Sequence, residues 1–143
     1  MIVVAMPEEL ALVDSRHDTA LVTGAGAQNV IRSLADIDRD TPIFNVGYAG
    51  GNKLEVGSRV RVGKVGFYHP IAGAISGETE RLLDGNVPCY TSGDFVENAD
   101  IQEPCVFDME LAYILALGFT NVSAEKVVSD NLSKKEFEEC LKK

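Results

Sequence analysis

The chain has 143 residues, 45% hydrophobic and 24% charged, a composition ordinary for a globular protein, and its length predicts one domain over residues 1–143. Its formal net charge of −9 argues against binding nucleic acid or an anionic membrane surface through the net field. Three widely spaced cysteines form no C-x-x-C motif and no Cys/His cluster, so we expect no disulfide framework, metal or cofactor. Because residues 2–5 are too short for a signal peptide and no run approaches membrane-spanning length, we expect a cytoplasmic protein.

Six short apolar, β-branched runs are each followed by acidic or glycine-rich residues. The runs, which we predict to be strands, are residues 2–5, 20–23, 43–46, 87–91, 105–107 and 126–128. The segments after them are Pro7-Glu8-Glu9, Gly24-Ala25-Gly26, Gly47-Tyr48-Ala49-Gly50-Gly51, Ser92-Gly93-Asp94, Asp108-Met109-Glu110 and Ser129-Asp130. In an open α/β sheet, loops beyond the carboxyl ends of the strands form the ligand crevice. The six segments therefore predict one converging site.

Three further segments have recognisable periodicity. Residues 27–37 carry apolar side chains at helical spacing, which predicts an amphipathic helix after the turn at Gly24 and Gly26. Residues 57–68 carry alternating apolar side chains and predict a hairpin that turns near Gly63-Lys64. Residues 111–117 are apolar all round, as in a helix buried within the fold or at a subunit interface.

The last helix has a start signal of its own. Ser133 and Glu136 form a capping box, with Leu132 and Phe137 placed as its hydrophobic staple. A helix is therefore predicted from Ser133, with Asp130 in the short loop before it. Strands that alternate with helices predict an α/β protein, a three-layer αβα sandwich around a central mixed β-sheet.

Asp130 and Glu110 are carboxylates in unusual surroundings. Asp130 follows an apolar strand, so it is either an ordinary loop aspartate or a general acid whose pKa an apolar wall raises. Glu110 shares a predicted helix face with Tyr113 and Ile114. Either the helix N-terminus stabilises its charge, or it accepts hydrogen bonds from vicinal hydroxyls such as a ribose diol. The residues alone leave both alternatives open.

The first helical turn and the glycines are also ambiguous. At least one of Glu8 and Glu9 is expected to complement a helix dipole, and the other is available to deprotonate a water. Gly24 and Gly26 form only a partial dinucleotide fingerprint and indicate a tight turn. The glycines at 47–51 allow either close approach of the backbone to a ligand or another chain, or a sharp turn.

Seven short motifs span almost the whole chain. They are Ala5-Met6-Pro7-Glu8-Glu9, Thr23-Gly24-Ala25-Gly26, Asn45-Val46-Gly47-Tyr48-Ala49-Gly50-Gly51, Val56-Gly57-Ser58, Ser92-Gly93-Asp94-Phe95-Val96, Phe107-Asp108-Met109-Glu110 and Val128-Ser129-Asp130. Together and in this order they resemble the nucleoside phosphorylase/hydrolase superfamily, and most closely its 5′-methylthioadenosine/S-adenosylhomocysteine nucleosidases. The resemblance implies that the ligand is a small purine nucleoside and that its N-glycosidic bond is cleaved.

The resemblance also implies roles by position. Asp130 matches the general acid that protonates N7 of the departing purine, and Glu9 matches the base that activates the attacking water. Glu110 matches the carboxylate that binds the ribose hydroxyls. The other residues implied to bind substrate are Met109, Gly50, Phe95, Val96 and Ser129. Protonation of the leaving group and a positioned nucleophile suit an oxocarbenium-like centre.

Hydrolysis is favoured over phosphorolysis because no arginine stands where the superfamily's phosphate ligands would align. The resemblance also implies a homodimer or a larger homo-oligomer. The segments 14–19 and 72–86 are shorter than in the family, and Tyr48 stands where the family usually has a small residue. These departures motivate a second hypothesis, a nucleoside-binding or sensing module without turnover. A purine nucleoside phosphorylase is the third.

Overall fold

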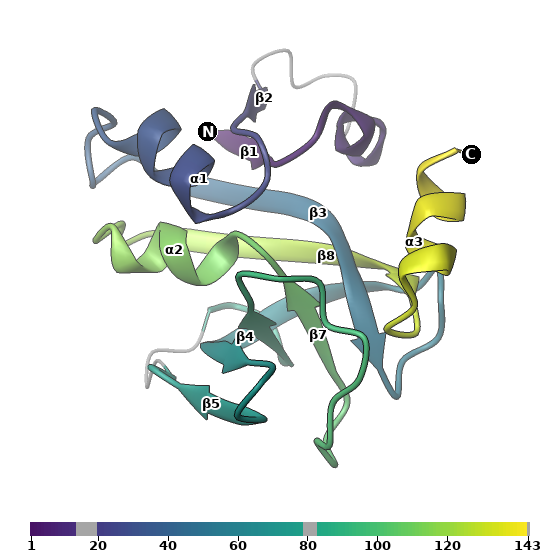
Figure 1. The fold of residues 1–143 in the computed structure, drawn as a ribbon. Helices are drawn as coiled ribbons and strands as arrows, with labels where there is room; N and C mark the ends of the chain where they lie inside the picture. The colour runs from purple at the N-terminus through teal and green to yellow at the C-terminus, as the bar shows by residue number, and fades with distance from the viewer. Residues whose placement is uncertain (14–19, 79–82, 143) are drawn as a thin grey trace.

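The computed structural model describes residues 1–13, 20–78 and 83–142, which form eight strands and four helices (Figure 1). In chain order the elements are β1 Ile2–Val4, the 3-10 helix η1 Pro7–Leu12, β2 Ala20–Val22, α1 Ala27–Leu34, β3 Ile43–Asn52, β4 Arg59–His69, β5 Ala74–Ser76, β6 Val87–Thr91, β7 Cys105–Asp108, α2 Leu111–Ala116, β8 Val122–Asp130 and α3 Lys134–Leu141. The shortened segment at 14–19 and part of that at 72–86 lie outside the described residues. Within the described ranges, each helix is too short or too polar to cross a membrane.

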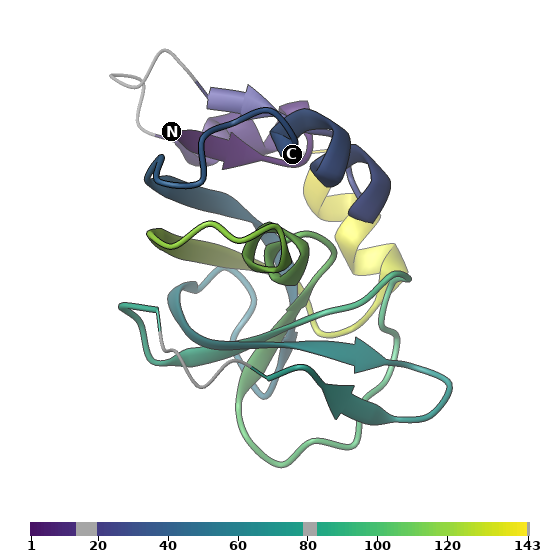
Figure 2. The same cartoon turned by 90° about the vertical axis from the view of Figure 1, so that its left-hand side faces the viewer.

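All eight strands belong to one mixed sheet, which confirms the predicted α/β fold (Figures 1 and 2). β3 pairs in parallel with β1 and β8, and antiparallel with β7. β6 joins β7 to β4 by parallel pairing on both sides. Because β8 also pairs antiparallel with β4, the strands β3, β7, β6, β4 and β8 close into a ring. Figure 1 shows that β3 bends along its length.

β3 is longer than the sequence predicted. Residues 47–51 continue the strand, so the prediction of a loop or sharp turn there was wrong. Close approach to the backbone does occur, and it is made by side chains of the protein itself. A Cβ on Gly47 would lie 2.5 Å from Glu9 Oε2, and a Cβ on Gly51 would lie 2.6 Å from Val128 Cγ1. Glycine is required where such neighbours press on a strand.

The hairpin predicted near Gly63 and Lys64 was wrong, because β4 runs through this segment as one continuous strand. The chain turns only after β4, whose end pairs antiparallel with β5. A Cβ on Gly63 would lie 2.7 Å from the carbonyl oxygen of Gly85, so this glycine also marks a close approach. The register between β4 and β6 shifts at the same place.

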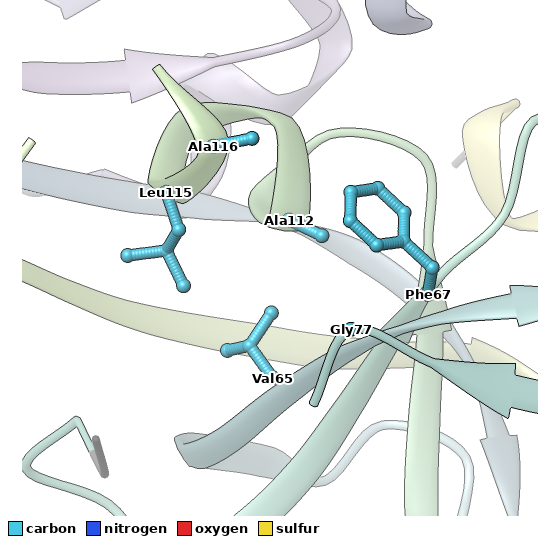
Figure 3. A pocket seen from close by; sticks show the side chains of 6 residues that line it. All are labelled: Val65, Phe67, Gly77, Ala112, Leu115 and Ala116. Atoms are coloured by element: carbon cyan, nitrogen blue, oxygen red, sulfur yellow. The ribbon is translucent and has the colours of Figure 1, made fainter. Parts of the chain in front are cut away.

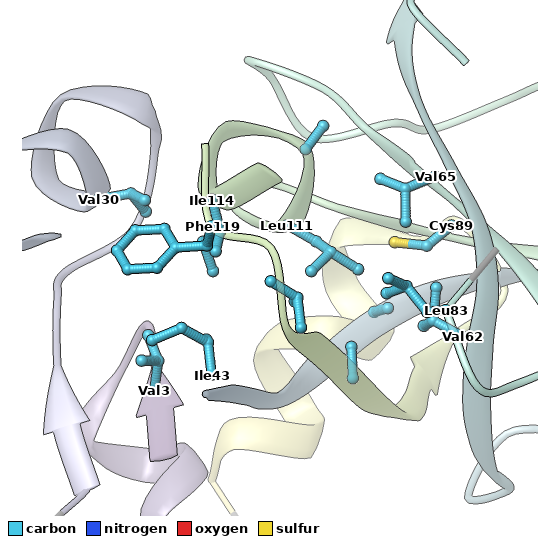
Figure 4. Close-up of a cluster of buried hydrophobic side chains, with 14 of the residues drawn as sticks. Val3, Val30, Ile43, Val62, Val65, Leu83, Cys89, Leu111, Ile114 and Phe119 are labelled. Atoms are coloured by element: carbon cyan, nitrogen blue, oxygen red, sulfur yellow. The ribbon is translucent and has the colours of Figure 1, made fainter. Parts of the chain in front are cut away.

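The main hydrophobic core lies between the sheet and the helices α1 and α2 (Figure 4). α1 buries Val30 and Leu34, as its predicted amphipathic spacing requires, although the helix ends at Leu34 rather than at residue 37. α2 buries Leu111, Ala112 and Ile114, as predicted for an apolar helix. Each large aliphatic side chain buried here contributes about 2 kcal/mol, so packing rather than intrinsic propensity holds these short helices.

α3 begins where the capping box predicted. Ser133 Oγ accepts a hydrogen bond from the backbone N–H of Glu136 at 3.2 Å. The backbone N–H of Ser133 donates to Asp130 Oδ2 at 3.0 Å. Between these two residues, Leu132 has a φ of 61°. The start of α3 is therefore attached to Asp130, which is the last residue of β8 rather than a loop residue.

Candidate functional site

A cavity of about 180 Å³ lies beside the middle of β3, between η1, the end of β7 and α3. Four of the six segments that the sequence predicted to converge contribute to its wall. A smaller annex of about 30 Å³ shares part of this wall and reaches Asp94, which belongs to one further segment, Ser92-Gly93-Asp94. The predicted site residues that line the cavity or its annex are Glu9, Gly50, Phe95, Val96, Met109 and Glu110.

Glu9 is buried at the wall, with 1% of its surface exposed. It is the third residue of η1, and its Oε1 accepts hydrogen bonds from the backbone N–H groups of Ala5 and Met6, each at 2.9 Å. Its Oε2 accepts one from the N–H of Tyr48 at 2.7 Å. Glu8, in contrast, is exposed. Glu9 therefore closes the first turn of η1 and ties it to β3 while facing the cavity.

A buried ion pair lies next to the cavity. Lys126 Nζ is 3.1 Å from Asp108 Oδ2, and the two side chains are 1% and 0% exposed. Asp108 also accepts hydrogen bonds from Thr91 Oγ1 at 2.5 Å and from the N–H of Leu111 at 2.9 Å. Burial opposes both charges, but the attraction between them lowers the pKa of Asp108 and raises that of Lys126.

Lys126 is the residue of this site that the sequence analysis missed. It lies on β8, where residues 122, 124, 126 and 128 are buried and the alternate ones are partly exposed. A lysine in that buried series requires an acidic partner inside the protein. The alternation of buried and partly exposed positions along β8 was therefore a sequence signal that Lys126 is buried.

Glu110 is 7% exposed and is the N-cap residue of α2, although its side chain makes no hydrogen bond to the first turn of this helix. Its Oε2 accepts a hydrogen bond from the N–H of Met109 at 2.9 Å. Burial raises the pKa of Glu110 to about 8, against the attraction of Lys126, and the charges of Asp108 and Glu9 add to the increase. Below this pH Glu110 is mostly protonated, so the buried charges of Asp108 and Lys126 balance each other beside it.

This burial makes a testable prediction about stability. A carboxyl whose folded pKa is raised stabilises the fold below its unfolded pKa, near 4.5, and loses that contribution as the pH rises through about 8. Each unit of pKa difference corresponds to about 1.4 kcal/mol. Between pH 4.5 and 8, wild type should therefore lose several kcal/mol relative to Glu110→Gln in urea unfolding, whereas the exposed Glu139→Gln should follow wild type. Parallel curves for wild type and Glu110→Gln would contradict it.

Asp130 and Ser129 lie behind Gly50 and line neither hollow. The pairing of β3 with β8 shifts register here, so that Gly50 faces Asp130 and Ser129 is the extra residue of a bulge. Ser129 Oγ donates to Asp130 Oδ1 at 2.6 Å. Burial raises the pKa of Asp130, and the hydrogen bonds from Ser129 and Ser133 only partly oppose this.

Aromatic rings form much of the remaining wall. The rings of Phe95 and Phe137 have centroids 5.6 Å apart and close the side next to α3. Phe107 packs edge-on against Tyr68, with centroids 5.1 Å apart. Tyr48 also lines the cavity but leaves it open. Apolar walls with a few polar groups are typical of sites for small organic ligands.

A second cavity, of about 230 Å³, lies between α2 and the strands β4 and β5 (Figure 3). It is lined by Val65, Phe67, Gly77, Ala112, Leu115 and Ala116. None of these side chains titrates, so this apolar groove offers no catalytic chemistry. In the part of the chain that the structure describes, no three His, Cys, Asp or Glu side chains are grouped as a metal site would require.

Neither a protein-family model nor a curated protein matches the sequence. Solved structures match the fold. A variant of the MTAN from Chlamydia trachomatis has a TM-score of 0.75 at 16% identity, over 99% of this chain and 86% of that chain. The 5′-methylthioadenosine/S-adenosylhomocysteine nucleosidase from Neisseria meningitidis, in complex with methylthio-immucillin-A, has a TM-score of 0.75 at 19% identity, over 99% and 90%.

Futalosine hydrolase of Helicobacter pylori has a TM-score of 0.70 at 13% identity, over 98% of this chain and 89% of that chain. At these identities the likeness is one of fold. It extends over nearly the whole of this chain and most of each neighbour. The chain therefore has the nucleoside phosphorylase/hydrolase fold, as its seven motifs predicted.

Proposed function

We propose that the protein hydrolyses the N-glycosidic bond of a purine nucleoside of the 5′-methylthioadenosine or S-adenosylhomocysteine kind. The observation that carries this proposal is the position of Glu9 and Glu110 on the wall of one aromatic-lined cavity, with Asp130 directly behind Gly50. These acids come from distant parts of the sequence. The likeness in fold to nucleosidases supports the same assignment.

In the proposed reaction, Glu110 accepts hydrogen bonds from the ribose hydroxyls. Asp130 donates its proton to N7 of the purine, so that the base leaves as a neutral molecule when the bond to C1′ breaks. Glu9 takes a proton from the water that forms the new bond to C1′. Exchange with solvent then returns the proton from Glu9 and reloads Asp130. The raised pKa of Asp130 supports its role, because an acid must hold its proton near neutral pH.

The charges around the cavity favour water over phosphate as the nucleophile. No arginine or lysine is among the residues that line the cavity within the described chain, and the nearby Lys126 is held by Asp108. An incoming phosphate would meet Glu9 and Glu110 without a free cation. Phosphorolysis is therefore the weaker alternative.

A binding module without turnover is the second candidate function, and one observation favours it. Both oxygens of Glu9 accept backbone hydrogen bonds, three in all, so the carboxylate is already engaged in holding η1 and β3 together. Such a module would be stabilised by nucleosides against heat without releasing a base.

One experiment separates these functions. Purified protein is incubated in excess with 5′-methylthioadenosine, S-adenosylhomocysteine and adenosine, with and without phosphate, and free base is measured by chromatography. We expect base release that does not depend on phosphate. Strict dependence on phosphate would establish a phosphorylase. A thermal shift without base release would establish the binding module. The absence of both base release and a thermal shift would remove both proposals.

We also retain the expectation of a homodimer or larger homo-oligomer in the cytoplasm. The apolar groove beside α2 and the partly exposed Leu115 support an interface on this side. Sedimentation at low micromolar concentration should show at least a dimer, and a monomer alone would contradict the expectation.

A further inference from the structure

One wall of the annex belongs to a long loop that depends on side chains for its position. Residues 92–104 connect β6 to β7 without a helix or strand. Within the described chain, residues 95–104 make no backbone-to-backbone hydrogen bond outside the helices and strands. Phe95 and Val96 of this loop line the annex together with Gly50 of β3. The wall therefore stays in place only through contacts with the rest of the protein.

Asn52, the last residue of β3, holds the far end of this loop. Its Nδ2 donates hydrogen bonds to the carbonyl oxygens of Ile101 at 2.9 Å and Glu103 at 3.0 Å. The amide therefore uses both of its N–H groups on the loop. Because Asn52 is buried, an apolar side chain in its place would leave these two carbonyls without their donors and loosen the attachment.

Two neighbouring side chains hold the same part of the loop. Lys53 Nζ donates to the carbonyl oxygen of Gln102 at 3.0 Å, so the end of β3 supplies donors to three successive carbonyls. The hydroxyl of Tyr90 donates to Glu103 Oε1 at 2.6 Å. Lys53 has a φ of 61°, a left-handed conformation that a lysine rarely adopts. Such a conformation persists only where the surrounding structure fixes it.

The attachment at Asn52 is connected to the annex through the packing of the loop. Ala99 and Ile101, which lie between the two places, pack against the buried cluster that contains Val96. Asn52 itself lines neither the cavity nor the annex. It lies two residues after Gly50 on the same strand, so β3 forms one part of the wall and also fixes the loop that forms another.

We propose that Asn52 is a positioning residue of this site, whose amide holds residues 92–104 so that Phe95 and Val96 keep their places beside the ligand. This inference rests on the proposed function for the identity of the ligand, and it adds the residue that fixes this wall. Asn52 touches no reacting atom. Its loss should therefore weaken binding of the nucleoside rather than the chemical step.

The test compares two substitutions of Asn52 with one remote control. Asn52→Leu and Asn52→Asp both remove the donors at neutral pH, and aspartate also keeps the shape of the side chain, so it serves where leucine prevents folding. The matched control is Arg39→Met. Arg39 likewise donates to backbone carbonyls, those of Leu34 and Leu117 among them, but it lines neither the cavity nor the annex.

The first measurement needs neither ligand nor turnover. Methyl order parameters of Val96, measured by NMR in the ligand-free protein, report how firmly the loop is held. We expect them to fall in both Asn52 variants and to keep the wild-type value in Arg39→Met. Unchanged order parameters in the folded Asn52 variants would overturn the proposal.

The second measurement is the kinetics of base release. In the Asn52 variants KM should rise by about threefold to tenfold, because only part of the protein then has the wall in place. The value of kcat should stay within about twofold of wild type, and Arg39→Met should change neither constant. A lower kcat at unchanged KM would contradict the proposal. A wild type that neither binds nor cleaves any nucleoside would refute the proposed function, and the order parameters would still decide the role of Asn52.

Discussion

Asp130→Asn is expected to lower the rate of adenine release from 5′-methylthioadenosine by about 10²- to 10⁴-fold. Asparagine keeps an oxygen that can accept the N–H of Ser133, but it has no proton to give to N7. The fold should therefore remain intact while the leaving group loses its acid. Single-turnover measurements with excess protein report this step. The exposed Asp100→Asn is the matched control and should retain the wild-type rate.

The choice of leaving group sharpens this test. A riboside that releases nitrophenolate needs no protonation to depart, so Asp130→Asn should cleave it at nearly the wild-type rate. An equal loss on both substrates would show that Asp130 supports the fold or binding rather than the departure of the base. With the natural leaving group, the rate should decline as the pH rises through the raised pKa of Asp130, because the acid is then ionised.

Lys126→Met is expected to lower the free energy of unfolding by about 3–5 kcal/mol. The substitution leaves Asp108 charged, buried and without its cation. Urea unfolding followed by circular dichroism measures the loss. Arg59→Met is the matched control, since Arg59 pairs with Glu125 at the surface, and an exposed pair contributes about 1 kcal/mol or less.

A double substitution identifies the origin of this loss. Asp108→Asn combined with Lys126→Met removes both charges, so it should recover part of the stability lost in Lys126→Met alone. Additive losses would contradict the assignment of the loss to an unpaired carboxylate. Lys126→Met should also raise the pKa of Glu110 further, because it removes the attraction that now opposes burial.

Much of the fold was predictable because its signals are local. The strands were read from β-branched runs, and the start of α3 was read from Ser133 and Glu136, whose hydrogen bond spans three residues. The glycines of β3 and β4 were misread because a glycine allows a turn and a close approach equally well. At Gly63 the close approach is made by the carbonyl oxygen of Gly85, and the sequence alone does not show that these two residues lie side by side.

The same distinction applies to the site. The acids at strand ends were predicted to converge, and Glu9 and Glu110 do line one cavity. The position of Asp130 behind Gly50 was not foreseen, because it follows from a bulge in the pairing of β3 with β8. The burial of Lys126 could have been predicted from the alternation along β8, but its partner Asp108 lies on β7, which the sequence does not place beside it. The catalytic roles of these residues stay predictions.

The absence of side chains at two points of β3 has a consequence for redesign. Glu9 rests against the bare backbone at Gly47, and Asp130 does so at Gly50. The separation of the two acids therefore depends on the backbone positions of these two glycines, which are three residues apart in β3. Exchanging Tyr48 or Phe95 would reshape the wall of the cavity without altering that spacing. An added methyl at Gly47 would collide with Glu9, and one at Gly50 would press first on Leu132 and then on Asp130.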